Sequence, residues 1–311
     1  MTPLAFIPPP PTDGFQIGPL FLHLYGLCIA LGVLAAFWLA NRRWVAAGGK
    51  PGELERPGIW AVAAGFLGAR IAYVSTHIDK FHGKWWEVLY IWQGGLALYG
   101  GLTLGILTGI WAARRYRLPV LRALDAAIPA IPLAQAFGRW GNYFNQELFG
   151  TPTTLPWALE VERDFRPARY AEFATFHPTF LYESLYNLLV AGILIWVGAR
   201  RRLRPGSLAL LYLVLYGAGR FLLELLRTDT TYRLFGLSRN AYVSLAVVVG
   251  GSVWLYLRER RRPPADGPEE AAPEEAAEAE EAGPAAEADA PTTAEEAPAG
   301  GRDEGGGRGG P

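Results

Sequence analysis

A short stretch in the middle of the chain, residues 138–150, gathers polar and charged side chains that could do chemistry. Its sequence is GRWGNYFNQELFG, so it carries Arg139, Asn142, Asn145 and Glu147 between apolar segments long enough to cross a bilayer. Ionisable groups at the edge of a membrane are costly to hold there, and they mark a functional site by default. The glycines could instead serve helix packing and the asparagines could cap helices. That alternative leaves the arginine and the glutamate unexplained.

A second set of charges lies in a later apolar segment. Arg220, Glu224 and Arg227 are four and three residues apart, and on a helix this spacing places all three on one face. Because a guanidinium fits phosphate oxygens in a bidentate way, this face could line a cavity for an anionic group. A structural ion pair between Arg220 and Glu224 is the alternative, and the sequence leaves both interpretations open.

Other hydrogen-bonding side chains fall near the expected outer ends of apolar segments, notably His23, Tyr25 and Tyr99. A lone His or Tyr at such a place is more often an interface anchor than a catalyst. The single cysteine, Cys28, excludes a disulfide within the chain and any cysteine-based metal site.

Several classes of enzyme and receptor are excluded by what the sequence lacks. The last apolar segment, 239–257, has no lysine for a retinal Schiff base, and the sequence shows no Gly-x-Ser-x nucleophile turn paired with a histidine, as an intramembrane serine protease requires. The sequence also contains no Walker loop, zinc-ligand cluster or dinucleotide-binding fingerprint. We therefore expect no metal, no nucleotide cofactor and no nucleic-acid partner.

Apolar runs of membrane-spanning length must position these residues. About 20 predominantly apolar residues are needed to cross the hydrocarbon core. The fourth run is the weakest, because Pro129 and Pro132 lie inside it and predict a kinked or partly re-entrant helix. The chain is thus expected to be an all-α integral membrane protein with seven transmembrane helices. The seven runs lie at roughly 18–40, 58–77, 94–113, 120–137, 178–199, 206–226 and 239–257.

The lysines and arginines of the loops predict the orientation. Four arginine-rich clusters, in 41–56, 114–122, 200–204 and 258–262, fall on one side of the membrane if there are seven spans. Short loops rich in Lys and Arg stay cytoplasmic. The N-terminus is therefore expected to be extracytoplasmic and the C-terminus cytoplasmic. The long segment at about 138–177 then becomes a small extracytoplasmic head.

The end of the chain has a different composition. Residues 263–311 carry 14 Asp and Glu against 2 Arg, a net charge of −12, whereas the rest of the chain carries +12. With no aromatic or large aliphatic residue to bury, this acidic tail is expected to be disordered, a docking segment being the alternative. The predicted organisation is an extracytoplasmic segment at 1–17, a seven-helix catalytic domain at 18–257, and a cytoplasmic basic flank with the tail at 258–311.

Residues 138–150 resemble the signature of the prolipoprotein diacylglyceryl transferase family, which reads Gly-Arg-x-(Gly/Ala)-Asn-Phe-(aliphatic or aromatic)-Asn-x-Glu-x-x-Gly. Tyr143 is the one departure, at a position where the family usually has Phe. The resemblance extends from residue 17 to about residue 257. It is carried also by collinear segments at 17–19, 22–27, 68–73, 92–96, 177–183 and 216–220.

The resemblance implies a transferase of the bacterial plasma (inner) membrane that acts in lipoprotein biosynthesis. Such enzymes transfer the sn-1,2-diacylglyceryl group of phosphatidylglycerol to the cysteine thiol of a lipobox in a lipoprotein precursor, which forms a thioether and releases glycerol 1-phosphate. The implied partners are phosphatidylglycerol, prolipoprotein lipobox segments and the lipid bilayer. No cofactor is implied, because the lipid is already an activated donor. A membrane transporter or binding protein for an anionic lipid or solute is the alternative, although the sequence shows no internal repeat.

The resemblance also implies roles for individual residues. Arg139 and Arg220 would hold the lipid phosphate, while Glu147 and Glu224 would orient the arginines and Glu147 could accept a proton. Tyr99 stands where the family often has a histidine proposed as general base, and a phenol with a pKa of about 10 is a poor base. The expected catalytic residues are Arg139, Arg220, Glu147, Tyr99 and Tyr25. The expected phosphatidylglycerol-binding residues are Arg139, Asn142, Asn145, Gly150, Arg220, Glu224 and His23.

Overall fold

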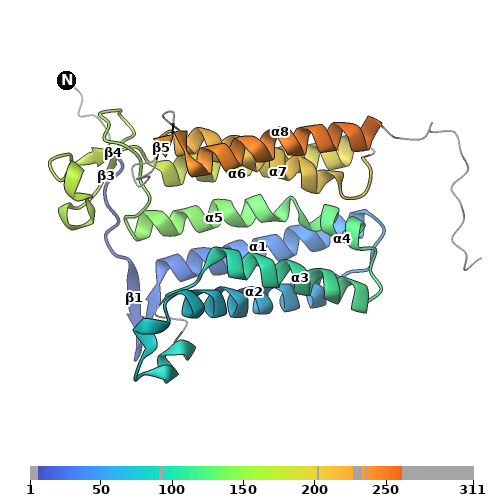
Figure 1. The fold of residues 1–311 in the computed structure, drawn as a ribbon, viewed down its shortest axis with the longest axis horizontal. Helices are drawn as coiled ribbons and strands as arrows, with labels where there is room; N and C mark the ends of the chain where they lie inside the picture. Colours follow the sequence, from blue (N-terminus) through green and yellow to red (C-terminus); the bar gives the residue numbers. More distant parts are fainter. Residues whose placement is uncertain (1–5, 91–93, 202, 227–232, 235–236, 261–311) are drawn as a thin grey trace, which may run out of the picture. The chain divides into compact units, whose positions relative to one another are not determined.

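The computed structural model describes residues 6–90, 94–201, 203–226, 233–234 and 237–260. Expectations that concern the acidic tail, Arg227 or the 92–93 part of the family-like segment lie outside these residues. Within them the chain is mostly helical, and Figure 1 shows long helices running side by side. The helices are α1 (Leu24–Ala46), α2 (Glu55–Thr76), α3 (Leu98–Arg115), α4 (Val120–Ala127), α5 (Ala130–Phe144), α6 (Thr179–Arg200), α7 (Ser207–Glu224) and α8 (Arg239–Arg260).

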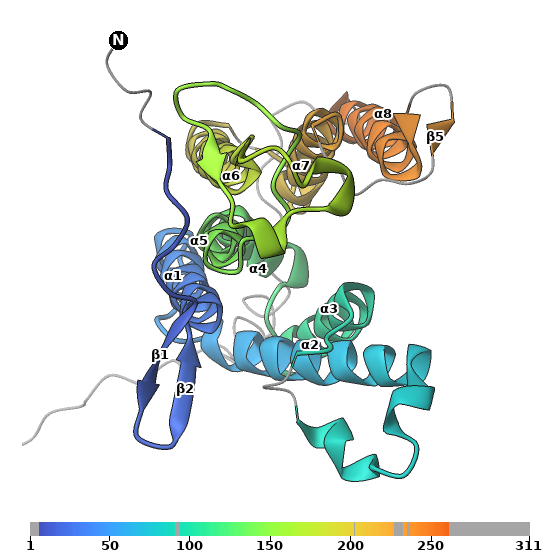
Figure 2. The same ribbon diagram turned by 90° about the vertical axis from the view of Figure 1, so that its left-hand side faces the viewer.

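The helices pack in pairs rather than around one centre. α1 lies against α5, α2 lies against α3, and α5 through α8 form a row in which each helix contacts the next. Figure 2, which looks nearly along α1, α5, α6 and α7, shows this row and the separate α2–α3 pair, with α2 running across the view. Because α5 contacts both α1 and α6, it is the helix to which residues from several parts of the chain can converge.

Apolar faces and helix length identify a multi-pass membrane protein. Within the described residues, six helical segments are long and apolar enough to cross a membrane, and α3 is not among them because its 18 residues end in Arg114 and Arg115. Large apolar side chains cover the outer faces, where water would make them costly and lipid would not. Leu34, Trp38, Trp60, Leu189 and Trp254 each expose more than half of their surface. The six segments are α1, α2, α4 with α5, α6, α7 and α8.

The fourth apolar run is broken, as its prolines predict. α4 ends at Ala127, and α5 starts at Ala130 with Pro129 at its N-cap. Pro129 fits there because a helix start needs no N–H from it. α5 continues to Phe144, beyond residue 137 where the fourth apolar run was expected to end. The first half of the 138–150 stretch is the end of α5, and the interhelical segment begins at Asn145.

Glycines allow α2 and α3 to approach each other closely. A Cβ added to Gly68 would lie 2.5 Å from the backbone oxygen of Gly100, a distance at which something must shift. The hydrophobic effect does not drive helices together inside a membrane. Small residues at the contact instead allow the two backbones to pack closely and gain van der Waals attraction. This contact therefore fixes α3 beside α2.

Arg70, a charge inside α2, holds the segment that connects α2 to α3. Its Nε donates to the oxygen of Val88 at 2.7 Å and its Nη2 to the oxygen of Glu87 at 2.7 Å. Its Nη1 donates to the oxygens of Gly94 at 2.8 Å and Gly95 at 3.1 Å. With 7% of its surface exposed, Arg70 satisfies its donors on backbone carbonyls and has a structural role.

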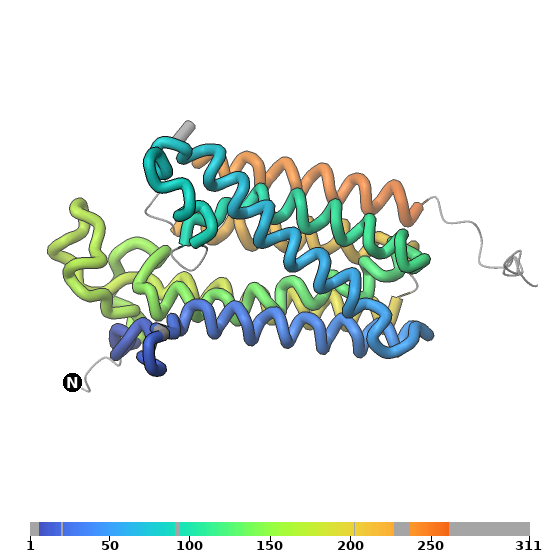
Figure 3. The backbone as a smooth tube through the Cα atoms, turned by 90° about the horizontal axis from the view of Figure 1, so that it is seen from below, coloured from blue at the N-terminus to red at the C-terminus, as the bar shows by residue number. Residues whose placement is uncertain are grey.

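Irregular structure gathers at one end of the helices, the left-hand end in Figures 1 and 3. It comprises the hairpin of β1 (Gly14–Ile17) and β2 (Leu20–His23), the short helices Ile78–Phe81 and Trp85–Leu89, and the segment between α5 and α6. That last segment contains the antiparallel strands β3 (Leu159–Glu160) and β4 (Thr175–Phe176) and the short helices Arg163–Phe165 and Ala168–Tyr170; the small pair of β5 (Arg233–Leu234) and β6 (Leu237–Ser238) precedes α8. The arginine-rich ends of α1, α3, α6 and α8 lie at the other end.

The segment between α5 and α6, residues 145–178, has a core of its own and is called the head below. Its core side chains are Phe149, Leu159, Val161 and Phe176, which pack with Phe180 of α6, and each is at most 7% exposed. The N-terminal segment joins it, since the Ile7 nitrogen donates to the Ala158 oxygen at 2.8 Å. The head therefore sits as a packed unit directly beyond the end of α5.

Candidate active site

Arg139 lies near the end of α5 and is held by two partners. Its Nη2 lies 2.6 Å from Oε2 of Glu183 on α6, and its Nη1 donates to Oδ1 of Asn142 at 3.2 Å. Asn142 is three residues further along the helix, so the two side chains share a face. The Arg139 side chain is 25% exposed and that of Glu183 is 7% exposed. The buried carboxylate thus fixes an arginine that keeps some contact with its surroundings.

The same network continues to Glu147. Asn142 Nδ2 donates to Glu147 Oε1 at 2.9 Å, and Asn145 Nδ2 reaches the same oxygen at 3.4 Å. Among the described residues, the other carboxylate oxygen of Glu147 has no partner. Arg139, Asn142, Asn145 and Glu147 are therefore connected by one hydrogen-bond network. Glu147 reaches Arg139 through Asn142, whereas Glu183 is its direct counterion.

A tight turn after α5 brings Glu147 back towards the helix. Gln146 and Leu148 adopt left-handed φ angles of 50° and 58°, and the Glu147 nitrogen donates to the Asn142 oxygen at 3.0 Å. Left-handed backbone is uncommon for residues other than glycine and is found often at functional sites. Leu148 is held there, because its oxygen accepts a hydrogen bond from Thr179 Oγ1. The turn gives Glu147 its place in the network.

Gly150, the last residue of the 138–150 stretch, lies where the head meets two helices. A Cβ at this position would lie 2.8 Å from the Cβ of His177 and 3.2 Å from the oxygen of Leu226. The Gly150 nitrogen donates to the His177 oxygen at 2.9 Å. Only glycine fits this close approach, so Gly150 positions the turn rather than presenting a side chain.

Arg220 forms the second arginine site, on α7. Its Nη2 lies 2.8 Å from Glu224 Oε2, one helical turn away. Glu224 Oε1 accepts from Ser238 Oγ at 2.8 Å and from Asn240 Nδ2 at 3.3 Å. Arg220 and Glu224 therefore form the ion pair that their spacing allows. With the Arg220 side chain 22% exposed, the pair does not close off the guanidinium.

The two arginine sites meet between α6 and α7. Glu183, the counterion of Arg139, and Arg220 line the same small pocket, together with Asn187 and Tyr216. Tyr186 packs there over Gly219 and donates its hydroxyl to the Leu215 oxygen at 2.6 Å. Glu183 thus pairs with Arg139 and also lines the pocket that Arg220 lines.

Three other residues that the sequence predicts for the site make no hydrogen bond to this network in the part of the chain that the structure describes. Tyr25 lies on α1 against α5, since a Cβ on Gly141 would be 2.5 Å from the Tyr25 ring. His23 is on the β1–β2 hairpin, with Nδ1 3.8 Å from Asp13 Oδ2. Tyr99 starts α3, is 82% exposed and, within the described ranges, makes no hydrogen bond. The structure joins Tyr25 to the site and leaves Tyr99 outside its hydrogen-bond network.

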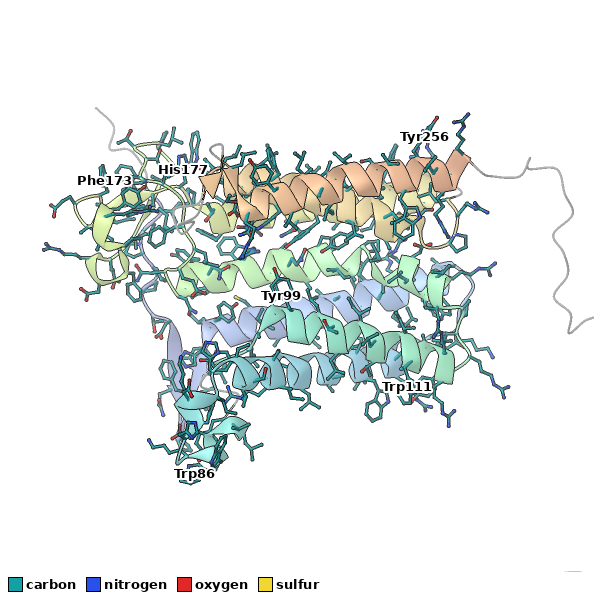
Figure 4. The ribbon with its side chains drawn as sticks, viewed as in Figure 1. Trp86, Tyr99, Trp111, Phe173, His177 and Tyr256 are labelled. Atoms are coloured by element: carbon teal, nitrogen blue, oxygen red, sulfur yellow. The ribbon has the colours of Figure 1, made fainter. Side chains whose placement is uncertain are left out.

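His177 lies at the junction of the head and α6 (Figure 4). Its Nδ1 is 3.2 Å from the Tyr182 hydroxyl, which also accepts from Trp157 Nε1 at 2.9 Å. Partial burial lowers the pKa of His177 below its ordinary value of 6.5. His177 is thus favoured as a neutral ring that joins the head to α6.

The predicted set of site residues lacks three side chains that the structure brings to the two arginine sites, namely Glu183, Ser238 and Asn240. It also lacks Gln146, which lines the cavity described below. Glu183 closes the family-like segment at 177–183, which was the one available signal for it. Ser238 and Asn240 gave no signal, because their partner Glu224 comes from another helix.

A large cavity opens beside the turn that carries Glu147. Its volume is about 850 Å³, and it is an open pocket lined by the N-terminal segment at 10–13, the turn at 144–149 and the head. Asp13, Glu147 and Glu162 contribute to its lining. The lining of this cavity therefore carries carboxylates, and neither Arg139 nor Arg220 contributes to it.

Comparison with known proteins adds to this geometry. Residues 13–257 match the family described as prolipoprotein diacylglyceryl transferase. Phosphatidylglycerol–prolipoprotein diacylglyceryl transferase 2 of Streptomyces coelicolor is 46% identical over 264 residues, which cover 84% of this chain and 83% of that protein. The enzymes of the same activity from Streptomyces griseus and Cutibacterium acnes are each 42% identical; they cover 84% and 82% of this chain, and 80% and 87% of their own lengths.

Proposed function

The chain belongs to the prolipoprotein diacylglyceryl transferase family, and on this premise we propose that it moves a diacylglyceryl group from phosphatidylglycerol to the cysteine thiol of a lipoprotein precursor. The chain is a multi-pass membrane protein, and it is a transferase that acts in lipoprotein maturation. The acceptor is a lipobox cysteine, and the alternative of a transporter is not favoured, because the relatives are named for the transferase activity.

The observation that carries the proposal is that two arginines are each held in place by an ion pair with a buried glutamate. Arg139 is fixed by Glu183 and Arg220 by Glu224, at 2.6 Å and 2.8 Å. A preorganised donor that meets developing charge contributes about 3–4 kcal/mol to a transition state. We assign both guanidinium groups to the phosphate of phosphatidylglycerol and to the charge that grows on it as it departs.

The chemical step is a substitution at the glycerol carbon next to the phosphate. The precursor thiolate forms a C–S bond to C3 of the diacylglyceryl group while the C–O bond to phosphate breaks. The electron pair of that bond leaves on glycerol 1-phosphate, and the thiol proton goes to a base. A thiol with a pKa of about 8.5 is only partly ionised at neutral pH, so the base and the arginines must act together.

We assign the proton to Glu147. Its Oε1 is held by Asn142 and Asn145, and its Oε2 has no partner in the described part of the chain. Two amide donors fix the carboxylate so that the second oxygen can face a thiol. Tyr99 supports this role less well, because it is 82% exposed and lies apart from the arginines' hydrogen-bond network.

The remaining predicted residues have supporting roles. Asn142 and Asn145 would also meet the headgroup or ester oxygens of the lipid, and Tyr25 would orient it from α1 beside Gly141. His23 on the hairpin and Gly150 at the base of the head would shape the entrance. Glu224 orients Arg220.

The topology that fits this chemistry has seven spans, with α3 as the seventh beside α2. The arginine-rich helix ends lie at the end opposite to the head. Short loops rich in arginine stay cytoplasmic, so the head and the N-terminus are extracytoplasmic. A lipid headgroup and a precursor cysteine can meet at that membrane surface.

Incubation of the purified full-length protein with labelled phosphatidylglycerol and a lipobox peptide tests the proposal. We expect a thioether-linked diacylglyceryl peptide and glycerol 1-phosphate in equal amounts. Movement of labelled lipid across a vesicle membrane without any covalent product would instead favour the transporter. Removal of residues 263–311 should leave the transfer unchanged, since the family match ends at residue 257.

A further inference from the structure

The cavity beside Glu147 has a charge that does not suit the lipid. Asp13, Glu147 and Glu162 line it, and among its described lining residues there is no Lys or Arg. Arg166, which is close in sequence, is directed elsewhere, because its Nε donates to the Val161 oxygen at 2.8 Å and its Nη1 to the Ala171 oxygen at 3.2 Å. A phosphate group entering this cavity would be repelled by carboxylates without a compensating cation.

Gln146 offers a free hydrogen-bond donor at this cavity. Its side chain is buried, with 6% of the residue exposed, and it lines the cavity. Its Oε1 accepts from the Glu162 nitrogen at 2.9 Å, which fixes the amide group. The side-chain nitrogen makes no hydrogen bond to any described residue. An amide N–H at the cavity surface can donate a hydrogen bond, so the lining is suited to a ligand that brings a carbonyl oxygen.

The position and volume of the cavity indicate what kind of ligand it could hold. The cavity starts at Asn145 and Glu147 of the reaction site and extends to the head, which includes Phe165 and Pro167. A volume of about 850 Å³ lies within the range of about 300–1,000 Å³ that is usual for ligand sites. A chain that places its thiol near Glu147 would thus continue into this space.

We propose that the cavity binds the segment of the precursor directly after the reacting cysteine, in extended form, and that its carboxylates select against acidic residues in that segment. This inference rests on the proposed transferase activity. The two substrates are then separated by charge: the arginines take the anionic lipid, and the carboxylate-lined cavity takes a neutral or basic peptide. Gln146 donates to a backbone carbonyl of that peptide.

The test compares two lipobox peptides that differ only after the cysteine, one continuing with Gly, Ser and Asn and the other with Asp and Glu. With the wild-type protein we expect the KM of the acidic peptide to be about tenfold higher. The double variant Asp13→Asn/Glu162→Gln should bring the ratio of the two KM values to about two or less, with the KM of phosphatidylglycerol unchanged. Glu162→Lys should make the acidic peptide at least as good as the neutral one.

Asp164→Asn/Glu172→Gln is the matched control, because it removes the same charges from exposed positions of the head that do not line the cavity. It should keep the tenfold ratio. An unchanged ratio in Asp13→Asn/Glu162→Gln, or equal KM values for both peptides in the wild type, would overturn the inference while the transfer itself still stands. A wild-type protein that transfers to neither peptide would instead refute the proposed function, and the inference with it.

Discussion

Arg139 of α5 and Glu183 of α6 form an ion pair with 2.6 Å between Nη2 and Oε2, and this pair links the 138–150 stretch to a helix that begins beyond the head. The pair is mostly buried. Removing one partner from a buried pair leaves an uncompensated charge, which costs more than the pair itself contributes. The position of Arg139 therefore depends on a residue 44 positions later in the chain.

The first prediction concerns Glu183. Glu183→Gln keeps a hydrogen-bond acceptor for Arg139 but removes the charge that fixes it. We expect kcat/KM for phosphatidylglycerol to fall about 10- to 100-fold, since displacement of a catalytic group by about 1 Å can cost that much. Glu160→Gln, an exposed change in the head, serves as the control and should leave the rate unchanged. A Glu183→Gln protein with the wild-type rate would show that Arg139 does not need this partner.

The second prediction separates the two candidates for the base. Tyr99→Phe should lower transfer less than about threefold, whereas Glu147→Gln should lower it about 100-fold or more, the usual contribution of a general base. Single-turnover rates with saturating lipid and peptide measure the difference. A larger loss of rate in Tyr99→Phe than in Glu147→Gln would assign the role of general base to Tyr99 instead of Glu147.

The third prediction concerns the contact between α2 and α3. Gly68→Ala should destabilise the protein by about 1–3 kcal/mol, because its Cβ would meet the Gly100 backbone and overpack the contact. Gly192→Ala is the matched control on α6, since a Cβ there meets nothing within 4 Å. Thermal unfolding in detergent compares the two variants. Equal unfolding temperatures would mean that the two helices do not approach as closely as described.

The fourth prediction concerns pH and His177. Burial lowers the pKa of His177 in the folded protein below its ordinary value of 6.5, so the unfolded chain binds the proton more readily. The neutral ring therefore stabilises the fold at a pH above 6.5, and this stabilisation is lost as the pH falls from there through the lowered pKa. His177→Gln should reduce the loss of thermal stability between about pH 7.5 and pH 5. An identical pH profile in both proteins would contradict this.

Local patterns in the sequence predict much of the site, and tertiary contacts supply the rest. Arg139, Asn142 and Glu147 all lie in the stretch that the sequence singles out, and one helical turn and the following backbone turn join them. Pro129 likewise predicts the break between α4 and α5. Glu183 is different: its role depends on the contact between α5 and α6, which no local pattern encodes.

The end of α5 is a second feature that local sequence patterns do not predict. The fourth apolar run looks complete at residue 137, yet the break at Pro129 shortens the helix, and α5 continues to Phe144. The polar stretch is therefore half helix and half turn. Hydropathy locates apolar runs well, but it does not show where a helix with Gly and Asn at its end will stop.

The most direct test of the central claim is the transfer rate of Arg139→Ala and Arg220→Ala, measured with labelled phosphatidylglycerol and a lipobox peptide. Arg163→Ala, an exposed arginine of the head, is the control. We predict that each of the two variants folds and inserts but loses about 100-fold or more in kcat, as expected for loss of a donor to developing charge, while the control keeps its rate. Near-normal transfer by both Arg139→Ala and Arg220→Ala would contradict the assignment of these arginines to the phosphate.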